Sequence, residues 1–539
     1  MPERPQTLLF GLDGATFSIL DQLIDEGVTP FLGELRDRGQ WAELMSTVNP
    51  LTPPAWTTVM TGRSPGNHGI YDFIRAEERG GSVFFVMNSS RDRRVETLWE
   101  IASRQQRRAT ALNFFGLAPP RPVAGHTISG FVPYRHLRRA MWPLELWDDI
   151  QKLPGFDRKE LAMDLDLEKK SIQGLPEEDY DDWTALHRRR ERQWFEIAQM
   201  LLTNDPSDVT AIVFDGVDKL QHVFWRYLDP ELFDVHKASP ADQRVRNLCL
   251  DYYREVDGYL RQLTSLAGDD PRIFLVSDHG FGPTWEVFYL NVWLAERGYL
   301  GWHDESEHDT SGALTVNRLK SHVGMLDWDR TTAFCLTPSS NGVFIRRAEA
   351  GGPGIRAEDY ESFRTKIADD LLAWRDPASG GQVVTSVLTR EQAYPGTTME
   401  MAPDLLLTIR DGGFVSILNA ESPLMPRDEV LGTHRPEGVF MAAGPGIEPG
   451  KRDTPVDLID VTPTVLYSLG LPVPQDLEGR VPEGLFTSEH LAHHPFESGP
   501  PTLTPDPFPE HRPSRDEKAL EEEAEAEVMA RLKALGYVE

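Results

Sequence analysis

The chain has 539 residues, which is longer than a single compact core usually allows. Its 55 basic and 85 acidic residues give a net charge of −30, which disfavours a general surface for duplex nucleic acid or for an anionic membrane. Cys249 and Cys335 are its two cysteines, and they form neither a disulfide framework nor a zinc motif. With no signal-peptide segment and no apolar run long enough to cross a membrane, we expect a cytoplasmic protein.

The first part of the chain alternates strand and helix signals. An apolar run predicts a strand over 7–12, and a helix follows over 17–39 with a break at Pro30. A second helix is predicted over 53–61, because proline suits a first helical turn, and a second strand over 107–114. Continuous apolar strands between helices indicate an α/β fold with a mostly parallel sheet.

The middle of the chain contains two segments that interrupt this pattern. Residues 120–205 are rich in Arg, Asp, Glu and Trp, and 186–202 has amphipathic helical spacing. We interpret 120–205 as an insertion that forms part of a cap over the site, and 284–335 as a second insertion. Further strands are predicted over 209–214, 272–276, 342–345, 404–409 and 438–443.

The end of the chain is predicted to lie outside this α/β domain. Residues 1–485 form the domain, and 486–515 read as a Pro-rich linker. Residues 516–539 have helical spacing with an acidic first half. We expect a terminal helix there, available to dock on the core or to join two copies of the chain as a homo-oligomer.

Four short stretches end in residue types that bind metal ions, and three of the four follow apolar runs. These residues are Asp13, Asp218 with His222 four positions on, the adjacent Asp278 and His279, and His434 in a Gly-containing loop. Ligands of open α/β sheets bind at the carboxyl ends of the strands. One sheet edge is therefore expected to gather three Asp and three His, whose oxygen and nitrogen atoms suit zinc. Taken singly, Asp13 also fits a turn or cap residue, Asp218 with His222 a surface ion pair or helix cap, and His434 an exposed polar residue.

Thr52 stands directly before Pro53 and Pro54, at the predicted start of the helix. We expect it to be the N-cap residue, with its hydroxyl at the positive end of the helix. Capping alone would explain it. A hydroxyl bound to zinc, however, loses its proton far more easily and becomes a nucleophile. Because the two prolines remove amide donors, anion binding at this helix end would depend on metals.

These stretches together resemble the type I phosphodiesterase/nucleotide pyrophosphatase family of the alkaline phosphatase superfamily, over roughly residues 6–480. The most specific piece is 52–70, TPPAWTTVMTGRSPGNHGI, which is similar to the family's nucleophile segment. Residues 460–472, followed by Gly479 and Arg480, resemble its final helix and turn. The resemblance implies an alkaline-phosphatase-like three-layer sandwich, in which helices flank a central, mostly parallel sheet and cap segments are inserted.

The resemblance also implies an activity and a set of site residues. Thr52 would be the nucleophile and form a phosphothreonine intermediate in the hydrolysis of a phosphodiester or pyrophosphate bond. The substrate would be a small-molecule phosphate ester, with a nucleotide as the leading expectation. Two divalent metal ions are implied, zinc first and manganese as the alternative. Their ligands would be Asp13, Thr52, Asp278 and His279 for one ion, and Asp218, His222 and His434 for the other.

Two positions need separate interpretation. Animal members of the family often carry Asn three residues after the nucleophile, whereas this chain has Ala55, so we nominate Asn113 as the replacement donor. We interpret His68, in the family's H-G-I turn, as structural. The C/S-x-P-x-R motif of sulfatases is absent. A phosphomonoesterase or phosphomutase on the same scaffold stays open, and so does a non-catalytic regulatory module with a structural metal site.

Overall fold

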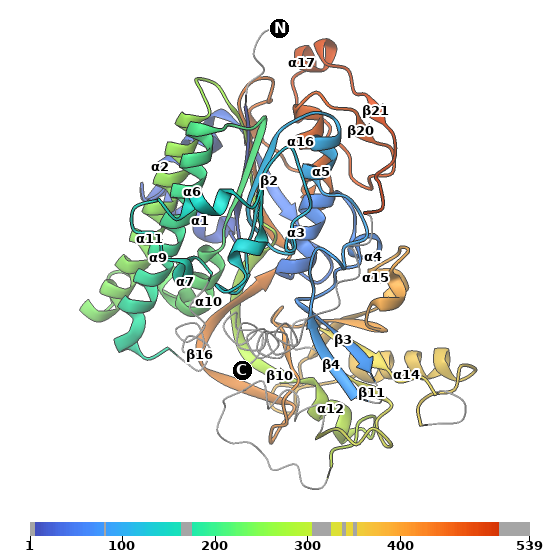
Figure 1. Cartoon of the computed structure of the whole chain (residues 1–539). Helices are drawn as coiled ribbons and strands as arrows, with labels where there is room; N and C mark the ends of the chain where they lie inside the picture. The colour runs from blue at the N-terminus through green and yellow to red at the C-terminus, as the bar shows by residue number, and fades with distance from the viewer. Residues whose placement is uncertain are drawn as a thin grey trace.

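The structure is a computed structural model, and it describes residues 6–79, 82–162, 175–303, 325–336, 341–348 and 353–505. Its largest element is a ten-stranded sheet (Figure 1). The strands lie in the order β18 (Gly450–Lys451), β2 (Gln40–Met45), β17 (Glu437–Ala443), β9 (Arg272–Val276), β1 (Thr7–Leu12), β8 (Val209–Phe214), β5 (Ala109–Phe114), β6 (Gly125–Ser129) and β7 (Met141–Trp142), with β19 (Val456–Asp457) paired to β2. The strands from β9 to β6 pair in parallel, so the expected mostly parallel sheet is confirmed.

Helices cover both faces of this sheet and form the three-layer sandwich. Alternate residues of a strand point to opposite faces, so Leu8 and Phe10 of β1 enter one core cluster and Leu9 enters the other. The first cluster is covered by α1 (Phe17–Asp25), α2 (Pro30–Arg38), α9 (Tyr180–Asn204), α10 (Gly216–Leu228) and α11 (Pro240–Leu266). The second is covered by α3 (Thr52–Thr61), α5 (Leu98–Arg104) and α16 (Val461–Ser468).

A second lobe extends from the sheet and has its own core. It contains the three-stranded sheet β15 (Val415–Ser416), β10 (Gly280–Tyr289) and β16 (Leu424–Arg435). It also contains the four-stranded sheet β11 (Ala333–Phe334), β12 (Gly342–Ile345), β14 (Leu405–Ile409) and β13 (Val384–Thr389), with the helices α12 (Leu290–Glu296) and α14 (Tyr360–Leu372). The strands predicted over 342–345 and 404–409 therefore belong to this lobe and not to the central sheet.

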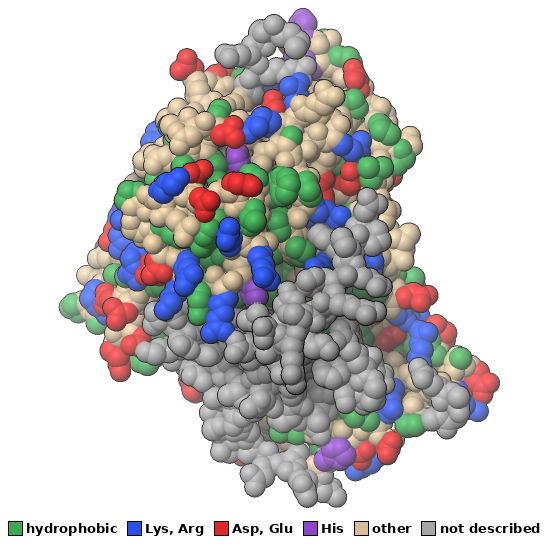
Figure 2. Space-filling model, in the orientation of Figure 1, with side chains coloured by type: hydrophobic (Ala, Val, Ile, Leu, Met, Phe, Trp, Pro, Cys, Tyr) green, Lys and Arg blue, Asp and Glu red, His purple; other side chains and the backbone are tan. Residues whose placement is uncertain are grey.

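The shorter elements complete the two lobes. They are α4 (Pro65–His68), the hairpin of β3 (Ile74–Arg79) and β4 (Ser82–Met87), α6 (Leu146–Ile150), α7 (Arg158–Leu161) and α15 (Arg390–Ala393). On the described part of the face shown in Figure 2, basic and acidic side chains lie interspersed in spite of the net charge of −30. None of the helices within the described ranges is both long and apolar enough to span a membrane.

The described residues of the predicted insertion over 120–205, which are 120–162 and 175–205, belong to the central sheet and its helical layer and do not form the expected cap. They supply the strands β6 and β7 of the central sheet and the helix α9, which packs beside α11 (Figure 1). The apolar side of α9, including Trp194, Ile197 and Leu201, lies in the first core cluster. An amphipathic helix has the same spacing whether it covers a site or a sheet, so its sequence pattern could not separate the two. The described parts of 284–335 do leave the central sheet, as expected, and join the second lobe.

The predicted linker over 486–515 is wrong for its described part, residues 486–505. Phe486 is buried, α17 (Ser488–His493) follows it, and β21 (Ser498–Gly499) pairs with β20 (Val473–Pro474). Thr502 donates two hydrogen bonds to the Asp476 carboxylate. These contacts hold a proline-rich stretch against the core. The helix predicted over 516–539 lies outside the described residues.

Candidate metal centre

The six candidate ligands converge because three neighbouring strands end at the same edge of the sheet. Strand β1 lies between β9 and β8 and is parallel to both, with Leu12 opposite Phe214 and Gly11 opposite Val276. The residues that follow these strands are Asp13 after β1, Asp218 and His222 in α10 after β8, and Asp278 and His279 after β9. His434 was expected in a loop, but it lies within β16, where it is paired with Phe281 of β10.

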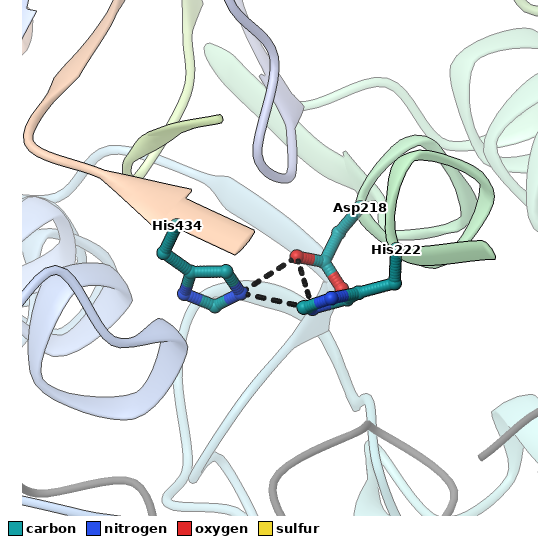
Figure 3. A group of neighbouring side chains, drawn as sticks. All are labelled: Asp218, His222 and His434. Atoms are coloured by element: carbon teal, nitrogen blue, oxygen red, sulfur yellow. Dashed lines mark hydrogen bonds and ion pairs between the residues drawn. The ribbon is translucent and has the colours of Figure 1, made fainter. Parts of the chain in front are cut away.

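Asp218, His222 and His434 form the first cluster (Figure 3). Asp218 Oδ1 lies 3.1 Å from His434 Nε2 and 3.6 Å from His222 Nε2, and the two Nε2 atoms are 3.1 Å apart. Four ligand atoms arranged in a tetrahedron about 2.1 Å from a zinc ion would lie about 3.4 Å from one another. All three separations are within a few tenths of an ångström of that value, so these residues fit a tetrahedral metal site.

The second cluster has the same spacing around His279. Its Nε2 atom lies 3.2 Å from Asp278 Oδ2, 3.6 Å from Asp13 Oδ1 and 3.4 Å from Thr52 Oγ1. Asp13, Asp218 and His279 also place one ligand atom each within 4.8 Å of one another. The rings of His279 and His434 stack with centroids 3.6 Å apart. The structure therefore brings all seven predicted side chains into one paired centre, with Asp218 between the two clusters.

Backbone carbonyl groups orient the three imidazole rings. The Nδ1–H group of His222 donates to Gly432 O at 3.0 Å, that of His434 to Pro50 O at 2.8 Å, and that of His279 to Gly280 O at 3.1 Å. A proton on Nδ1 leaves the Nε2 lone pair of each ring directed into the clusters. These acceptors could not be assigned from sequence patterns, because two of the three lie far along the chain from the ring that they hold.

Burial keeps the same rings neutral. It lowers the pKa of His222 to about 4 and that of His434 to about 3, and it holds the pKa of His279 well below its ordinary value. Neutral imidazole is the form that binds metals. With both Nδ1 atoms protonated, the Nε2 lone pairs of His222 and His434 face each other at 3.1 Å, an arrangement that a cation between them would stabilise.

The three carboxylates of the centre are also buried, and within the described residues each has one oxygen that accepts no hydrogen bond. Burial raises the pKa of Asp13 and Asp278 well above the ordinary range, and neighbouring carboxylates raise them further. Burial likewise raises the pKa of Asp218 to about 6. Within the described residues, no N–H or hydroxyl group donates to the converging oxygens Asp13 Oδ1, Asp218 Oδ1 and Asp278 Oδ2. Such oxygens are suited to a positive ion, since buried charges are normally paired or bound to metal.

Thr52 is the first residue of α3 and not its N-cap, which is Leu51. The expected capping role is therefore corrected, and the Thr52 hydroxyl lies against His279 instead. One turn further along α3, Trp56 donates from Nε1 to Asp13 Oδ2 at 3.1 Å. The spacing of four between Thr52 and Trp56 places both residues on one face of the helix.

The remaining site hypotheses have different outcomes. Ala55 is fully buried in the second core cluster. Asn113 does not replace an asparagine at that position, because its Nδ2 group donates to Val213 O at 2.9 Å and to Asp215 Oδ1 at 3.0 Å. His68 is fully buried, accepts from the Ile70 N–H group at Nδ1, and has Nε2 at 3.1 Å from Thr58 Oγ1. These contacts agree with a structural role for His68.

Comparisons with known proteins identify similar folds. The crystal structure of phosphonoacetate hydrolase from Sinorhizobium meliloti 1021 in complex with phosphonoformate is 18% identical, with a TM-score of 0.50, and the match covers 87% of this chain and 95% of that one. Murine ectonucleotide pyrophosphatase/phosphodiesterase 5 in complex with AMP is 13% identical, with a TM-score of 0.48 and coverage of 87% and 96%. The human protein of the same name is 12% identical, with a TM-score of 0.49 and coverage of 91% and 99%.

Sequence comparison gives one family. No curated protein matches the chain. Residues 7–437 match the family model described as Type I phosphodiesterase / nucleotide pyrophosphatase. That match spans most of the chain, from the first strand of the central sheet to the first residue of β17, and it includes every candidate ligand. The chain therefore belongs to the type I phosphodiesterase/nucleotide pyrophosphatase family, a family of phosphoester hydrolases.

Proposed function

We propose that this protein is a two-metal hydrolase of phosphodiester or pyrophosphate bonds, with Thr52 as its nucleophile. One observation carries the proposal. Two clusters of Asp and His atoms, each with separations of 3.1 to 3.6 Å, meet beside the Thr52 hydroxyl. Family membership supports phosphoester hydrolysis as the reaction class. Three imidazoles, three carboxylates and a hydroxyl favour zinc over manganese, since imidazole suits zinc and tetrahedral spacing is typical of it.

The two ions, when bound, would supply the positive charge that lowers the pKa of the threonine hydroxyl and stabilises the transferred phosphoryl group. Asp13, Thr52, Asp278 and His279 would hold one ion, and Asp218, His222 and His434 the other. The protein holds these ligand atoms in place before the ions bind. Trp56 holds the Oδ2 atom of Asp13, which leaves Oδ1 directed toward the cluster, and the backbone carbonyls hold the rings. Preorganised groups of this kind need no rearrangement as charge develops.

The proposed reaction proceeds in two displacements at phosphorus. Thr52 Oγ1 loses its proton and attacks the phosphorus atom, the bond to the leaving oxygen breaks, and a phosphothreonine forms. The leaving group takes up a proton. A water molecule then attacks the same phosphorus, the bond to Oγ1 breaks, and the threonine hydroxyl is regenerated with release of the phosphate product. Each step forms one bond to phosphorus and breaks one.

A nucleotide-type substrate is part of the proposal and is supported by family membership alone. Three aromatic residues near the centre could stack on a base, but they are buried, with Trp56 at 0%, Trp225 at 1% and Phe281 at 4% exposure. Trp225 and Phe281 stack on each other at 5.8 Å, so they pack the core beside the centre. A nucleotide base would therefore have to stack on residues other than these three.

The test is a substrate panel run on Thr52 variants. Metal-depleted protein would be reconstituted with zinc or manganese and assayed on a p-nitrophenyl phosphodiester, a p-nitrophenyl monoester and a dinucleotide pyrophosphate. We expect diester or pyrophosphate turnover that needs metal, a loss on the order of a thousandfold or more in Thr52→Ala, and partial activity in Thr52→Ser. Full activity in Thr52→Ala would exclude Thr52 as the nucleophile. Dominant monoester turnover would favour a phosphomonoesterase, and zinc-loaded protein with no turnover would favour a regulatory module.

A further inference from the structure

The turn at Gly14 connects the two ligand clusters through hydrogen bonds. Its N–H group donates to Asp278 Oδ1 at 3.1 Å, and its carbonyl oxygen accepts from Gln221 Nε2 at 2.7 Å. Gln221 is fully buried and lies in α10, between Asp218 and His222 in sequence. One glycine is therefore held by a ligand of the second cluster on one side and by the helix of the first cluster on the other.

The surroundings leave this connection little freedom. Gly14 has a φ of +68°, and a Cβ atom there would lie 3.0 Å from Phe281 Cδ2 and 3.2 Å from Asp218 Cβ. The backbone of Gln221 is packed as closely on its other side, because a Cβ atom at Gly432 would lie 2.3 Å from Gln221 O. Gly432 O is also the acceptor for the His222 ring. A shift of α10 would thus move ligands of both clusters.

We propose that Gln221 is a positioning residue that couples the two metal sites, so that binding of one ion strengthens binding of the other. The inference rests on the proposed two-metal function. An ion drawn to Asp13 and Asp278 fixes the Gly14 turn, and the Gln221 amide transmits that position to α10, which carries Asp218 and His222. Such coupling is reciprocal, and coupling between two sites typically amounts to a factor of roughly 5 to 150 in affinity.

A packing role for Gln221 predicts a different result from a coupling role. Methionine has a similar length and fills similar space, but it cannot donate to Gly14 O. Replacing Gln221 by Met therefore keeps the volume and removes the connection. The matched control is Gln193→Met in α9, since Gln193 is buried and accepts one backbone hydrogen bond, from Asp157 N at 2.8 Å, away from the centre.

The experiment measures stepwise zinc binding to metal-depleted full-length protein, by competition with a chromophoric chelator. We expect wild type and Gln193→Met to bind two ions with positive cooperativity. Gln221→Met is expected to bind two ions with a coupling factor at least fivefold smaller. Unchanged coupling in Gln221→Met overturns the inference, and so does independent binding of two ions by wild type. The wild-type titration tests the coupling even where Gln221→Met does not fold.

The outcomes separate this inference from the proposed function. If wild type binds two zinc ions and hydrolyses the diester, but its coupling factor equals that of Gln221→Met, the inference about Gln221 is overturned and the proposed function stands. Wild type that binds no pair of ions overturns both. A KM and kcat comparison at saturating zinc adds a second readout, because a residue that acts only on metal affinity leaves both constants of the fully loaded variant near their wild-type values.

Discussion

Glu191 lies against the first residue of α10, and its protonation can be tested through the pH dependence of stability. Its Oε1 atom accepts from Gly216 N at 2.7 Å and from the Tyr252 hydroxyl at 2.9 Å. Burial, together with the Asp215 carboxylate as a second cause, raises the pKa of Glu191 to about 7. Burial also opposes ionisation of Asp215, but the cations of Arg190 at 3.2 Å and Lys219 at 2.9 Å outweigh it and lower the Asp215 pKa. Glu191 is thus the proton-binding member of this cluster.

The sign of the effect follows from which state holds the proton. Between pH 4.5, the ordinary value for glutamate, and pH 7, the folded chain keeps the Glu191 proton while the unfolded chain has lost it. The free energy of unfolding therefore falls as pH rises through this window. At about 1.4 kcal/mol per unit, the whole shift corresponds to roughly 3 kcal/mol, of which about 2–3 kcal/mol accrues between pH 5 and pH 8.

Replacing Glu191 by Gln removes this titration and keeps an oxygen that accepts the same two hydrogen bonds. We expect the stability of Glu191→Gln relative to wild type to increase by roughly 2–3 kcal/mol from pH 5 to pH 8. Urea denaturation of both proteins at four pH values measures it, and taking the difference cancels every group that the two proteins share.

The control for this measurement is Glu255→Gln, which breaks a partly exposed ion pair with Arg188 between the same two helices, α9 and α11. It should change stability by less than about 1 kcal/mol at each pH. A flat or falling difference for Glu191→Gln would refute the reasoning.

Three further predictions follow from metal binding and backbone geometry. Chelation should abolish hydrolysis and lower the free energy of unfolding by about 4 kcal/mol relative to protein in free zinc at a thousand times its Kd; equal stability by urea denaturation in both conditions would contradict it. Gly14 and Gly27 have φ of +68° and +69°, but nothing lies within 4 Å of a Cβ at Gly27, so Gly27→Ala should cost about 1 kcal/mol and Gly14→Ala clearly more. Equal thermal shifts would argue against the close packing at Gly14. Asp257 accepts from the N–H groups of Phe31 and Leu32 at the start of α2 at 3.0 and 2.9 Å, so Asp257→Ala should cost about 2–3 kcal/mol in urea denaturation; a cost below about 0.5 kcal/mol would contradict this role.

The central sheet and the convergence of its ligands could be predicted from the sequence because both depend on local patterns. Fully buried parallel strands read as continuous apolar runs, and the burial of every residue in β1 and β8 explains why these runs were clear. Asp13 and Asp278 were found as the polar residues that end such runs. Asp218 and His222 were found by their spacing of four on one helix.

Contacts between distant segments could not be predicted in the same way. Asn113 stands at the end of its strand, where a site residue is expected, yet its φ of +64° and its bonds to Val213 and Asp215 turn it toward the neighbouring strand. The helix α9 looked like a cap because polar residues dominate its composition, whereas its apolar stripe decides its place. In both cases the missing information was the identity of the packing partner.

The orientation of the ligands is the clearest case of this limit. The His222 ring, on α10, is held by Gly432 O of β16, and the His434 ring, on β16, is held by Pro50 O just before α3. Each ring thus depends on the backbone of an element other than its own. Since a carbonyl group is present at every residue, no side-chain motif marks the acceptors. The residue types of the candidate metal centre are therefore encoded locally, mostly at strand ends, while its geometry is encoded in how α10, β16 and the segment before α3 pack together.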